Sequence, residues 1–322
     1  MRIVELRIIF ARSEVTRQAE PLKKFPFKIL EGCRTSLMAR ATGCFNMTKA
    51  EKKKFSKIKA FLLDMDGTLY IGGKMLPGAD KAVESIRVRG GRICFLTNNS
   101  SRSQRDYALK LNGLGIMASR DEVLTSQAAT MAYLKKNYPG KSLFVLGTPS
   151  LKEEFVQNGF FVAGGNADIA ILGYDTTLDY ATLAEFCLKI REGAPYIATH
   201  ADLNCPSPRG MLPDAGSMIE LISASAARRP DIICGKPFRP MTDAIFSKFS
   251  LPPLRGNQAC LAQSIAMIGD RMTTDMAFAK ANGFLSVLVL TGETTREMLD
   301  EGITSGRFAP PDIVLESIGE LC

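Results

Sequence analysis

The chain has 322 residues, of which 46% are hydrophobic and 23% are charged, with 27 glycines and 16 prolines. This composition is typical of a soluble globular protein and excludes a collagen, a coiled coil and a wholly disordered chain. No apolar run approaches the roughly 18 residues that a membrane-spanning helix needs, so a membrane-spanning protein is excluded as well. At ~150 residues per domain, the length predicts about two domains.

The net charge of +8 is concentrated at the N-terminus. Residues 1–59 carry 15 Lys or Arg against 5 Asp or Glu, whereas residues 60–322 carry 26 against 28. We expect residues 1–56 to be a basic, poorly ordered leader, or a translated upstream stretch with the true start at Met47. The alternatives are an arm that binds nucleic acid or a membrane surface, and a targeting segment, although acidic residues interrupt the leader.

The eight cysteines are dispersed, with no C-x-x-C pair and no dense cluster. This spacing favours buried thiols in a reducing cytoplasm over a disulfide framework. A zinc site has little support, because the single histidine, His200, has only Cys205 nearby. We therefore expect a cytoplasmic protein.

From residue 58 onward, short β-rich runs alternate with amphipathic stretches of helical length. The predicted strands are residues 58–65, 92–97, 142–147, 168–174, 196–199, 231–234, 264–268, 285–290 and 312–315. The predicted helices are residues 80–88, 103–111, 150–157, 180–191, 217–226, 242–249 and 273–281. This alternation is typical of βαβ units and predicts an α/β fold with a Rossmann-like, doubly wound and mostly parallel sheet.

Folds of this kind bind ligands at the carboxyl ends of their strands, so the polar residues after each apolar run are the candidates for a site. Asp64 and Asp66 follow the first run, and because alternate residues of a strand share a face, their carboxylates converge. Two carboxylates held together share a proton or bind a cation, and Mg²⁺ is the natural occupant. Asp270 and Asp275 follow another strand, where they could reach the same cation.

Other strand ends supply groups that suit a phosphate. Lys236 lies between Gly235 and Pro237 and could offset the negative charge of the four carboxylates. Thr97 and Asn98 precede a predicted helix, where hydroxyl, amide and backbone N–H groups are suited to binding phosphate. A carboxylate nucleophile, a second acid, Mg²⁺, a lysine and phosphate donors together indicate phosphoryl transfer through an aspartyl phosphate.

Four motifs, in this order, resemble those of the haloacid dehalogenase (HAD) superfamily of phosphatases: D-M-D-G-T from Asp64, F-L-T-N-N-S from Phe95, G-K-P from Gly235 and G-D-R-M-T-T-D from Gly269. Further stretches are similar to the NagD-like, p-nitrophenyl phosphatase branch with a type IIA cap: Leu69-Tyr70 with Pro77-Gly78, residues 198–210 and residues 289–295. The resemblance covers about residues 57–318.

The resemblance implies a role for each matched residue. Asp64 would be the nucleophile, and Asp66 the general acid and then the general base. The implied magnesium ligands are Asp64, the backbone carbonyl of Asp66, Asp270 and, in support of the metal shell, Asp275. The implied phosphate-binding residues are Thr97, Asn98 and Lys236.

The resemblance also implies a division into domains. The HAD core would comprise residues 57–125 and 232–322, and an inserted α/β cap, residues 126–231, would close over the site and contact the leaving group. We interpret His200 and Asp202 of this cap as specificity residues, or else as ordinary polar groups of a loop. Pairing through the cap would give a homodimer.

These inferences predict a Mg²⁺-dependent phosphatase that hydrolyses small phosphate monoesters, such as sugar phosphates or similar metabolites. We expect neither nucleic acid nor a membrane as a partner. A phosphotransferase on the same core and a catalytically idle protein that binds a phosphorylated ligand are the alternatives. The cap type argues against the first alternative, and the presence of all the motif residues argues against the second.

Overall fold

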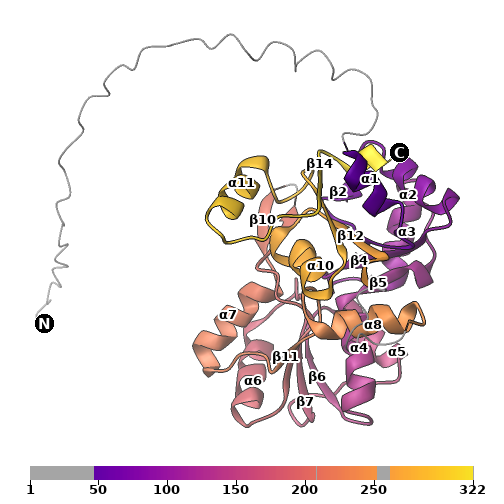
Figure 1. Cartoon of the computed structure of the whole chain (residues 1–322). Coiled ribbons are helices and arrows are strands. Elements are labelled where there is room, and N and C mark those ends of the chain that lie inside the picture. Colours follow the sequence, from indigo (N-terminus) through magenta and orange to yellow (C-terminus); the bar gives the residue numbers. More distant parts are fainter. Residues whose placement is uncertain (1–46, 208, 252–261, 322) are drawn as a thin grey trace, which may run out of the picture. The chain divides into compact units, whose positions relative to one another are not determined.

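The structure, a computed structural model, describes residues 47–207, 209–251 and 262–321. Its larger sheet has the strand order β14-β13-β12-β1-β4-β5, and every neighbouring pair is parallel (Figure 1). The strands are β1 (Ala60–Asp64), β4 (Arg92–Thr97), β5 (Val123–Thr125), β12 (Ile265–Gly269), β13 (Leu285–Val289) and β14 (Ile313–Leu315). The predicted α/β fold with a doubly wound parallel sheet is therefore confirmed.

Both faces of the larger sheet are covered, which explains why its strands are almost entirely apolar. Phe61 and Leu63 of β1 pack in one cluster with helices α2 (Ala79–Val88) and α3 (Gln104–Gly113). Leu62 packs in another cluster with α8 (Arg239–Lys248) and α10 (Ala277–Asn282). Since β1 lies between β4 and β12, the residues that end these three strands meet at one edge of the sheet.

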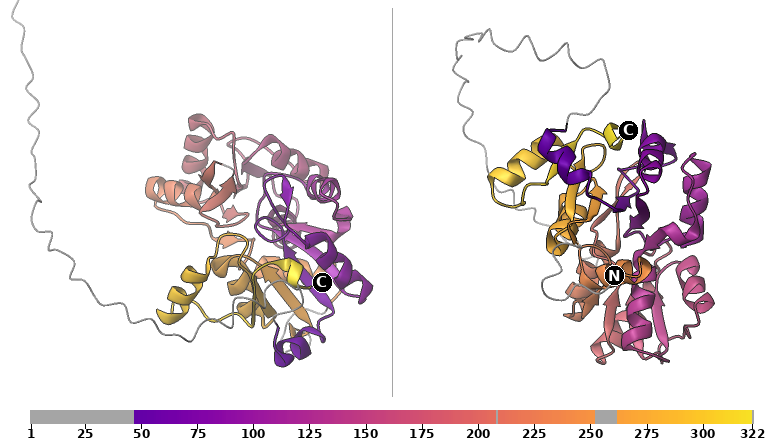
Figure 2. Two further views of the ribbon diagram at one scale, coloured as in Figure 1. Left: turned by 90° about the horizontal axis from the view of Figure 1, so that it is seen from above. Right: turned by 45° about the vertical axis from the view of Figure 1, so that its right-hand side comes forward.

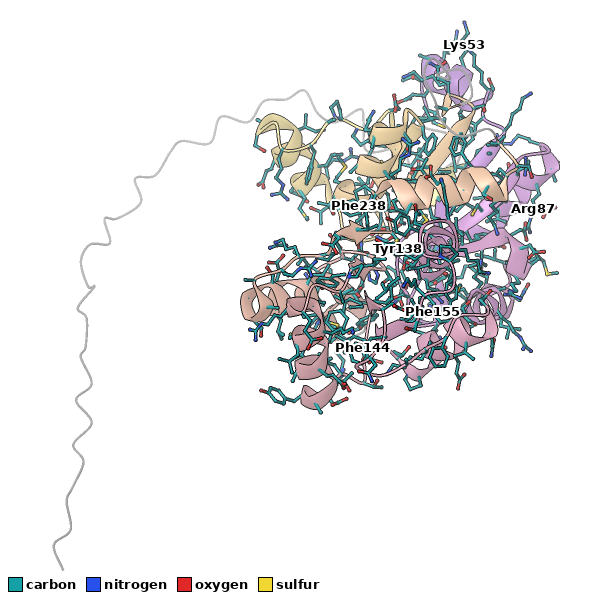
Figure 3. The ribbon with its side chains drawn as sticks, turned by 90° about the horizontal axis from the view of Figure 1, so that it is seen from below. Lys53, Arg87, Tyr138, Phe144, Phe155 and Phe238 are labelled. Carbon is teal, nitrogen blue, oxygen red and sulfur yellow. The ribbon has the colours of Figure 1, made fainter. Side chains whose placement is uncertain are left out.

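A second parallel sheet, in the order β11-β8-β7-β6, is built from chain between β5 and α8. Its strands are β6 (Leu143–Leu146), β7 (Ile169–Leu172), β8 (Tyr196–Ala198) and β11 (Ile232–Ile233). Its covering helices are α4 (Ser126–Asn137) and α5 (Pro149–Gln157) on one face, and α6 (Tyr180–Arg191) and α7 (Ala215–Ala226) on the other. Phe155 and Phe144, labelled in Figure 3, belong to these two faces, and Figure 2 gives two further views of both sheets.

The strand predicted at residues 231–234 forms as β11, but it pairs with β8 of the second sheet. That sheet therefore extends beyond residue 231, where the predicted insertion ends. The division into core and cap itself stays a prediction. Because β11 leads directly into Gly235 and Lys236, the lysine reaches the larger sheet from the carboxyl edge of the second one.

The expectation of a poorly ordered leader is wrong for residues 47–56. Helix α1 (Lys49–Phe55) begins with a capping box between Thr48 and Glu51, and Phe55 is buried with its ring centroid 5.5 Å from that of Phe61. A helix this short is anchored by so few apolar residues that it shows no period in the sequence. Its lysines point outward, as Lys53 does in Figure 3. Residues 1–46 lie outside the described residues.

The remaining elements are short or peripheral, and the sequence did not predict them. They are the antiparallel pairs β2 (Tyr70–Ile71) with β3 (Lys74–Met75) and β9 (Asn204–Ser207) with β10 (Gly210–Pro213), the helix α11 (Arg296–Thr304), and the short turns η1 (Arg120–Glu122) and η3 (Ile318–Leu321). Among the described residues, none of the helices has the length and apolar character needed to cross a membrane.

Candidate active site

Asp64 lies at the end of β1 and belongs to a buried ion-pair network that centres on Lys236. Its Oδ1 accepts a hydrogen bond from Lys236 Nζ at 2.6 Å, and the same ammonium donates to Asp275 Oδ1 at 2.7 Å. The Lys236 side chain is only 2% exposed. Burial alone would lower the pKa of Lys236, but Asp275 and Asp64 more than offset this and raise it, so the lysine stays charged.

Three carboxylates lie close together here, of which Asp64 and Asp275 bond the Lys236 ammonium. Asp64, Asp270 and Asp275 are all buried, and each offers an oxygen within 4.8 Å of the others. Burial, together with the charges of Asp275 and Asp270, raises the pKa of Asp64 well above its usual range, although Lys236 opposes the shift. Burial and then Asp275 raise the pKa of Asp270 to about 7. The one ammonium of Lys236 therefore does not balance the negative charge of the three carboxylates.

Asp270 shows where a further charge would fit. Its Oδ2 accepts the Glu293 N–H at 2.7 Å, whereas its Oδ1 is buried and has no hydrogen-bond partner among the described residues. A buried carboxylate oxygen without a partner is costly. The backbone also approaches closely, because a Cβ on Gly67, which has a φ of +85°, would lie 2.5 Å from Asp270 Oδ2. This all-oxygen donor set fits a hard divalent cation such as Mg²⁺.

The Asp270→Asn variant tests this fit. An asparagine still accepts the Glu293 N–H but removes one of the crowded charges, so in EDTA the variant should melt no lower than the wild type. Mg²⁺ should raise the melting temperature of the wild type, since a ligand at 100 times its Kd stabilises the folded state by about 2.7 kcal/mol, and should raise that of the variant much less. Calorimetry with and without Mg²⁺ measures both. An Asp270→Asn variant whose melting temperature rises with Mg²⁺ as much as that of the wild type would contradict the assignment. The control is Asp243→Asn, because Asp243 is exposed and this variant should show the full wild-type rise.

Asp275 is positioned by a break in the predicted helix. Residues Met272–Met276 form a π-helical turn, η2, and α10 begins only after it. Such turns are frequent at functional sites, because the extra residue redirects a side chain. Here the Asp275 carboxylate spans two partners, Lys236 and the Arg271 N–H, which donates to its Oδ2 at 3.1 Å. A Cβ on Gly269 would contact the same carboxylate, so a glycine is needed there.

Asn98 holds the backbone of Lys236 through both ends of its side-chain amide. Asn98 Oδ1 accepts the Lys236 N–H at 2.7 Å, and its Nδ2 donates to the Lys236 carbonyl at 3.0 Å, so this amide orients the lysine.

Asp66 is partly exposed to the cavity that Asp64 also lines. Burial raises the pKa of Asp66, although Lys110 opposes the shift. A raised pKa suits a carboxyl group that donates a proton.

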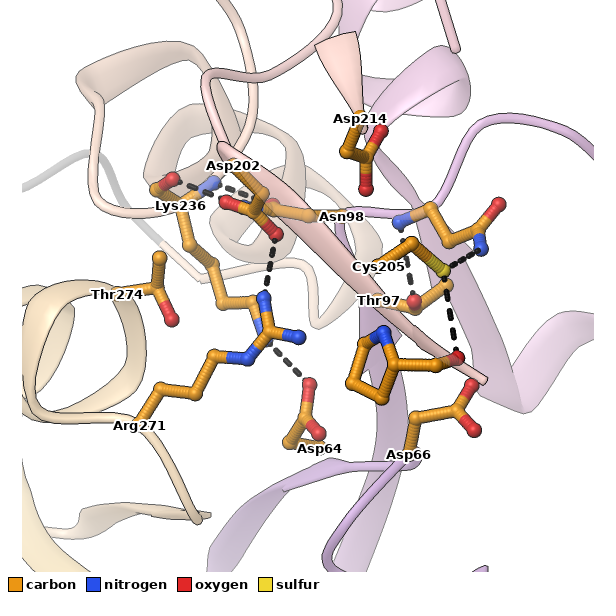
Figure 4. Close-up of a pocket in the computed structure, with 12 residues that line it drawn as sticks. Asp64, Asp66, Thr97, Asn98, Asp202, Cys205, Asp214, Lys236, Arg271 and Thr274 are labelled. Carbon is orange, nitrogen blue, oxygen red and sulfur yellow. Dashed lines mark hydrogen bonds and ion pairs between the residues drawn. The ribbon is translucent and has the colours of Figure 1, made fainter. Parts of the chain in front are cut away.

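One cavity collects most of the predicted residues (Figure 4). Its lining residues are Asp64, Asp66, Thr97, Asn98, Asn99, Asp202, Cys205, Pro206, Asp214, Lys236, Arg271 and Thr274. Its volume is only about 30 Å³, which is room for a water molecule or two. Sequence reasoning missed Arg271 and Asp214, although Arg271 stands inside the motif G-D-R and Asp214 caps α7.

His200 does not line this cavity. Its ring is fully buried, with Nε2 2.9 Å from Asp214 Oδ1 and Nδ1 3.0 Å from Thr199 Oγ1. Burial alone would lower the pKa of His200, but the Asp214 carboxylate outweighs this and raises it. The His200 ring is therefore buried away from the cavity. Asp202, the other predicted specificity residue, lines the cavity wall.

The raised pKa of His200 predicts a pH-dependent stability. The stabilisation from the charged pair with Asp214 is complete below the unfolded-state value of about 6.5 and is lost as the pH rises through the higher folded-state pKa. The difference in unfolding free energy between the wild type and His200→Gln should therefore shrink from acidic to alkaline pH. Urea titrations across that range measure it. A difference that stays constant or grows with pH would contradict the charged pair.

Models of known families match two segments of the chain: residues 61–161 match a haloacid dehalogenase-like hydrolase model, and residues 233–321 match a HAD-hydrolase-like model. The chain is 32% identical to the 5'-nucleotidase YutF of Bacillus subtilis, over 76% of this chain and 91% of that protein. It is also 32% identical to an acid sugar phosphatase of Staphylococcus aureus, over 82% of this chain and 98% of that protein.

Solved structures agree with these matches. A 4-nitrophenylphosphatase from Thermotoga maritima is 41% identical with a TM-score of 0.76, covering 83% of this chain and 97% of that one. A glycerol phosphate phosphatase from Mycobacterium tuberculosis, solved in complex with magnesium, is 28% identical with a TM-score of 0.71, covering 82% and 76%.

The parallel sheet that gathers buried carboxylates and a lysine at its carboxyl edge is thus the site of a hydrolase, and the chain belongs to the haloacid dehalogenase-like hydrolase family. Within that family it is a phosphoric monoester hydrolase of the NagD-like, p-nitrophenyl phosphatase branch.

Proposed function

We propose that this enzyme is a Mg²⁺-dependent phosphatase that hydrolyses small phosphate monoesters through a phosphorylated Asp64. The observation that carries the proposal is the Lys236 ammonium held between Asp64 and Asp275, with Asp270 beside them and one of its oxygens unpartnered. Asp64 is a buried carboxylate at a strand end, where positive charge gathers around it. Such a carboxylate suits the role of a nucleophile, because positive charge offsets that of the anionic phosphoryl group it accepts.

The first half-reaction forms an acyl phosphate. An Asp64 carboxylate oxygen attacks phosphorus, the bond from phosphorus to the ester oxygen breaks, and Asp66 donates its proton to the leaving alcohol. In the second half-reaction Asp66, now a carboxylate, takes a proton from water, whose oxygen attacks phosphorus. The bond between phosphorus and the Asp64 oxygen breaks, which releases inorganic phosphate and restores both residues.

In this proposal Thr97, Asn98 and Lys236 bind the phosphoryl group. Asp64, the Asp66 carbonyl and Asp270 would hold Mg²⁺, with Asp275 in support. When bound, Mg²⁺ supplies positive charge at the nucleophile and at the phosphoryl oxygens. The magnesium in the glycerol phosphate phosphatase of M. tuberculosis supports this choice of cation.

Residues 126–231 act as a cap in this proposal. We infer that the second sheet moves away to admit substrate and returns to exclude water, because the cavity that Asp64 and Asp66 line has a volume of only about 30 Å³. A homodimer formed through this cap and a cytoplasmic location remain predictions.

Sugar phosphates and similar metabolites are the proposed substrate class, which the acid sugar phosphatase of S. aureus and the 5'-nucleotidase of B. subtilis support. The test is a panel of sugar, glycerol and nucleoside monophosphates, assayed for released inorganic phosphate with Mg²⁺ or EDTA. We expect release that depends on Mg²⁺ and no transfer to added alcohols. Equal rates in EDTA, or phosphoryl transfer in place of release, would contradict the proposal.

A further inference from the structure

Arg271 is held by two carboxylates that come from different parts of the chain. Its Nη1 lies 3.1 Å from Asp202 Oδ2, and its Nε lies 3.0 Å from Glu293 Oε2 (Figure 4 shows the first contact). Asp202 belongs to the loop after β8 of the second sheet, whereas Glu293 follows β13 of the larger sheet. The side chains of Arg271 and Asp202 are only 13% and 9% exposed, so this bridge between the two parts is largely desolvated.

Asp202 and its loop are tied to the start of helix α7. Its carbonyl accepts the Gly216 N–H of α7 at 2.8 Å, and a Cβ on Gly216 would lie 2.7 Å from that same oxygen. The adjacent Leu203 carbonyl accepts Ser217 Oγ at 2.7 Å, and the buried pair of His200 with Asp214 joins the other side of the loop to the start of α7. These contacts hold Asp202 in a fixed position relative to α7.

The second oxygen of Asp202 reaches the catalytic centre. Asn98 Nδ2 donates to Asp202 Oδ1 at 2.9 Å, and that same amide nitrogen donates to the Lys236 carbonyl. One carboxylate of the second sheet thus contacts both Arg271 and the amide that orients the lysine. Withdrawal of the second sheet would break both contacts together.

Charge explains why an arginine is needed at this position. Closure brings the Asp202 carboxylate into a cavity that Asp64 and Asp66 also line. Of the described residues lining that cavity, Lys236 and Arg271 are the basic ones, and Lys236 is already shared between two carboxylates. Without Arg271, closure over an anionic substrate would place like charges in a water-poor site.

We propose that Arg271 is a positioning residue that latches the cap shut through Asp202, and so couples closure to the orientation of Asn98 and Lys236. This inference rests on the proposed function of residues 126–231 as a cap. It assigns to Asp202 a role in closure in addition to any contact with the leaving group.

A double-mutant cycle tests the latch in catalysis. Arg271→Gln and Asp202→Asn should each lower kcat/KM at least several-fold, and the double variant should be no worse than the poorer single variant, because both remove one interaction. Arg271→Lys should recover part of the loss, since it keeps the charge. Arg296→Gln is the matched control, because Arg296 forms an exposed pair with Glu316 at 2.9 Å, away from the cavity. If the fold-loss in kcat/KM of the double variant equals the product of the losses of the two single variants, the proposal is overturned.

Labelling of Cys205 tests the latch without substrate. This thiol lines the cavity and lies 3.7 Å from Asn99 Nδ2, so opening should expose it. We expect N-ethylmaleimide to label Cys205 faster, by about twofold or more, in Arg271→Gln, in Asp202→Asn and equally in the double variant, as measured by peptide mass spectrometry. Labelling at the wild-type rate in both single variants would overturn the proposal.

The two experiments separate this inference from the proposed function. A wild type that hydrolyses no phosphate monoester would contradict the function, while the labelling rates would still report on the latch. An active wild type whose single variants act independently would contradict the latch alone. If Arg271→Gln fails to fold, Asp202→Asn and Arg271→Lys carry both measurements.

Discussion

Replacing Asp64 by asparagine should lower turnover by about 10⁴-fold or more, the scale seen when a covalent nucleophile is removed. An amide oxygen is a poor nucleophile towards phosphorus, so the phosphorylated intermediate cannot form. The fold should persist, because asparagine has nearly the same volume and can still accept the hydrogen bond from Lys236 Nζ. Phosphate release with Mg²⁺, together with the melting temperature, measures both effects.

Asp300→Asn is the control for this substitution. Asp300 is exposed on α11, so the same chemical change there should leave turnover and melting temperature unaltered. Substantial Mg²⁺-dependent hydrolysis by the Asp64→Asn variant would rule out the aspartyl-phosphate mechanism.

Replacing Lys236 by methionine should damage both stability and activity. The change leaves the buried carboxylates of Asp64 and Asp275 without their shared ammonium, and removing one partner of a buried ion pair typically costs about 3–5 kcal/mol. Mg²⁺ should restore part of that stability, since it offsets the same charges. Activity should fall by about 10³-fold even with Mg²⁺, because a preorganised positive charge at the phosphoryl group is lost.

Urea unfolding with and without Mg²⁺ measures the stability part of this prediction. The matched control is Lys141→Met, because Lys141 forms an exposed pair with Asp168 at 3.1 Å. Such surface pairs contribute little, so the control should unfold like the wild type. An unfolding free energy of Lys236→Met that equals the wild-type value in EDTA would show that the carboxylates do not depend on the lysine for charge.

The strands that carry the site could be predicted from sequence because burial leaves a clear pattern. All residues of β1 and β12 are buried, so residues 60–63 and 265–268 appear as apolar runs, and the acids just after these runs stand out. Parallel pairing then brings Asp64, Asp270 and Asp275 to one edge of the sheet, where they offer oxygens within 4.8 Å of one another, whereas Asp66 is not part of this cluster.

Helix α4 could not be predicted in this way. Its buried residues include Ser126, Gln127 and Thr130, so no apolar stripe marks the face that packs. Polar residues are tolerated there because their side chains find partners: Ser126 Oγ donates to the Asn98 carbonyl, and Thr130 Oγ1 donates to the Ser126 carbonyl. The hairpin β9–β10 was missed for a different reason, since none of the residues in its two strands is buried.

The contacts between the two sheets were also beyond sequence reasoning. Arg271 and Asp202 are 69 positions apart, and their pairing depends on how the second sheet packs against the first. His200 was interpreted from its place in a loop, whereas its burial follows from packing against α7. Local patterns determine which residues end a strand but not which residues of another layer face them.

The most direct test of the account is acid quenching of the enzyme during turnover of a ³²P-labelled phosphate monoester from the substrate panel. We expect protein-bound label that maps to the peptide containing Asp64, that requires Mg²⁺, and that is absent from Asp64→Asn. Continued turnover with label on another residue, or with no protein-bound label when the quench is fast enough to capture the first half-reaction, would contradict the account.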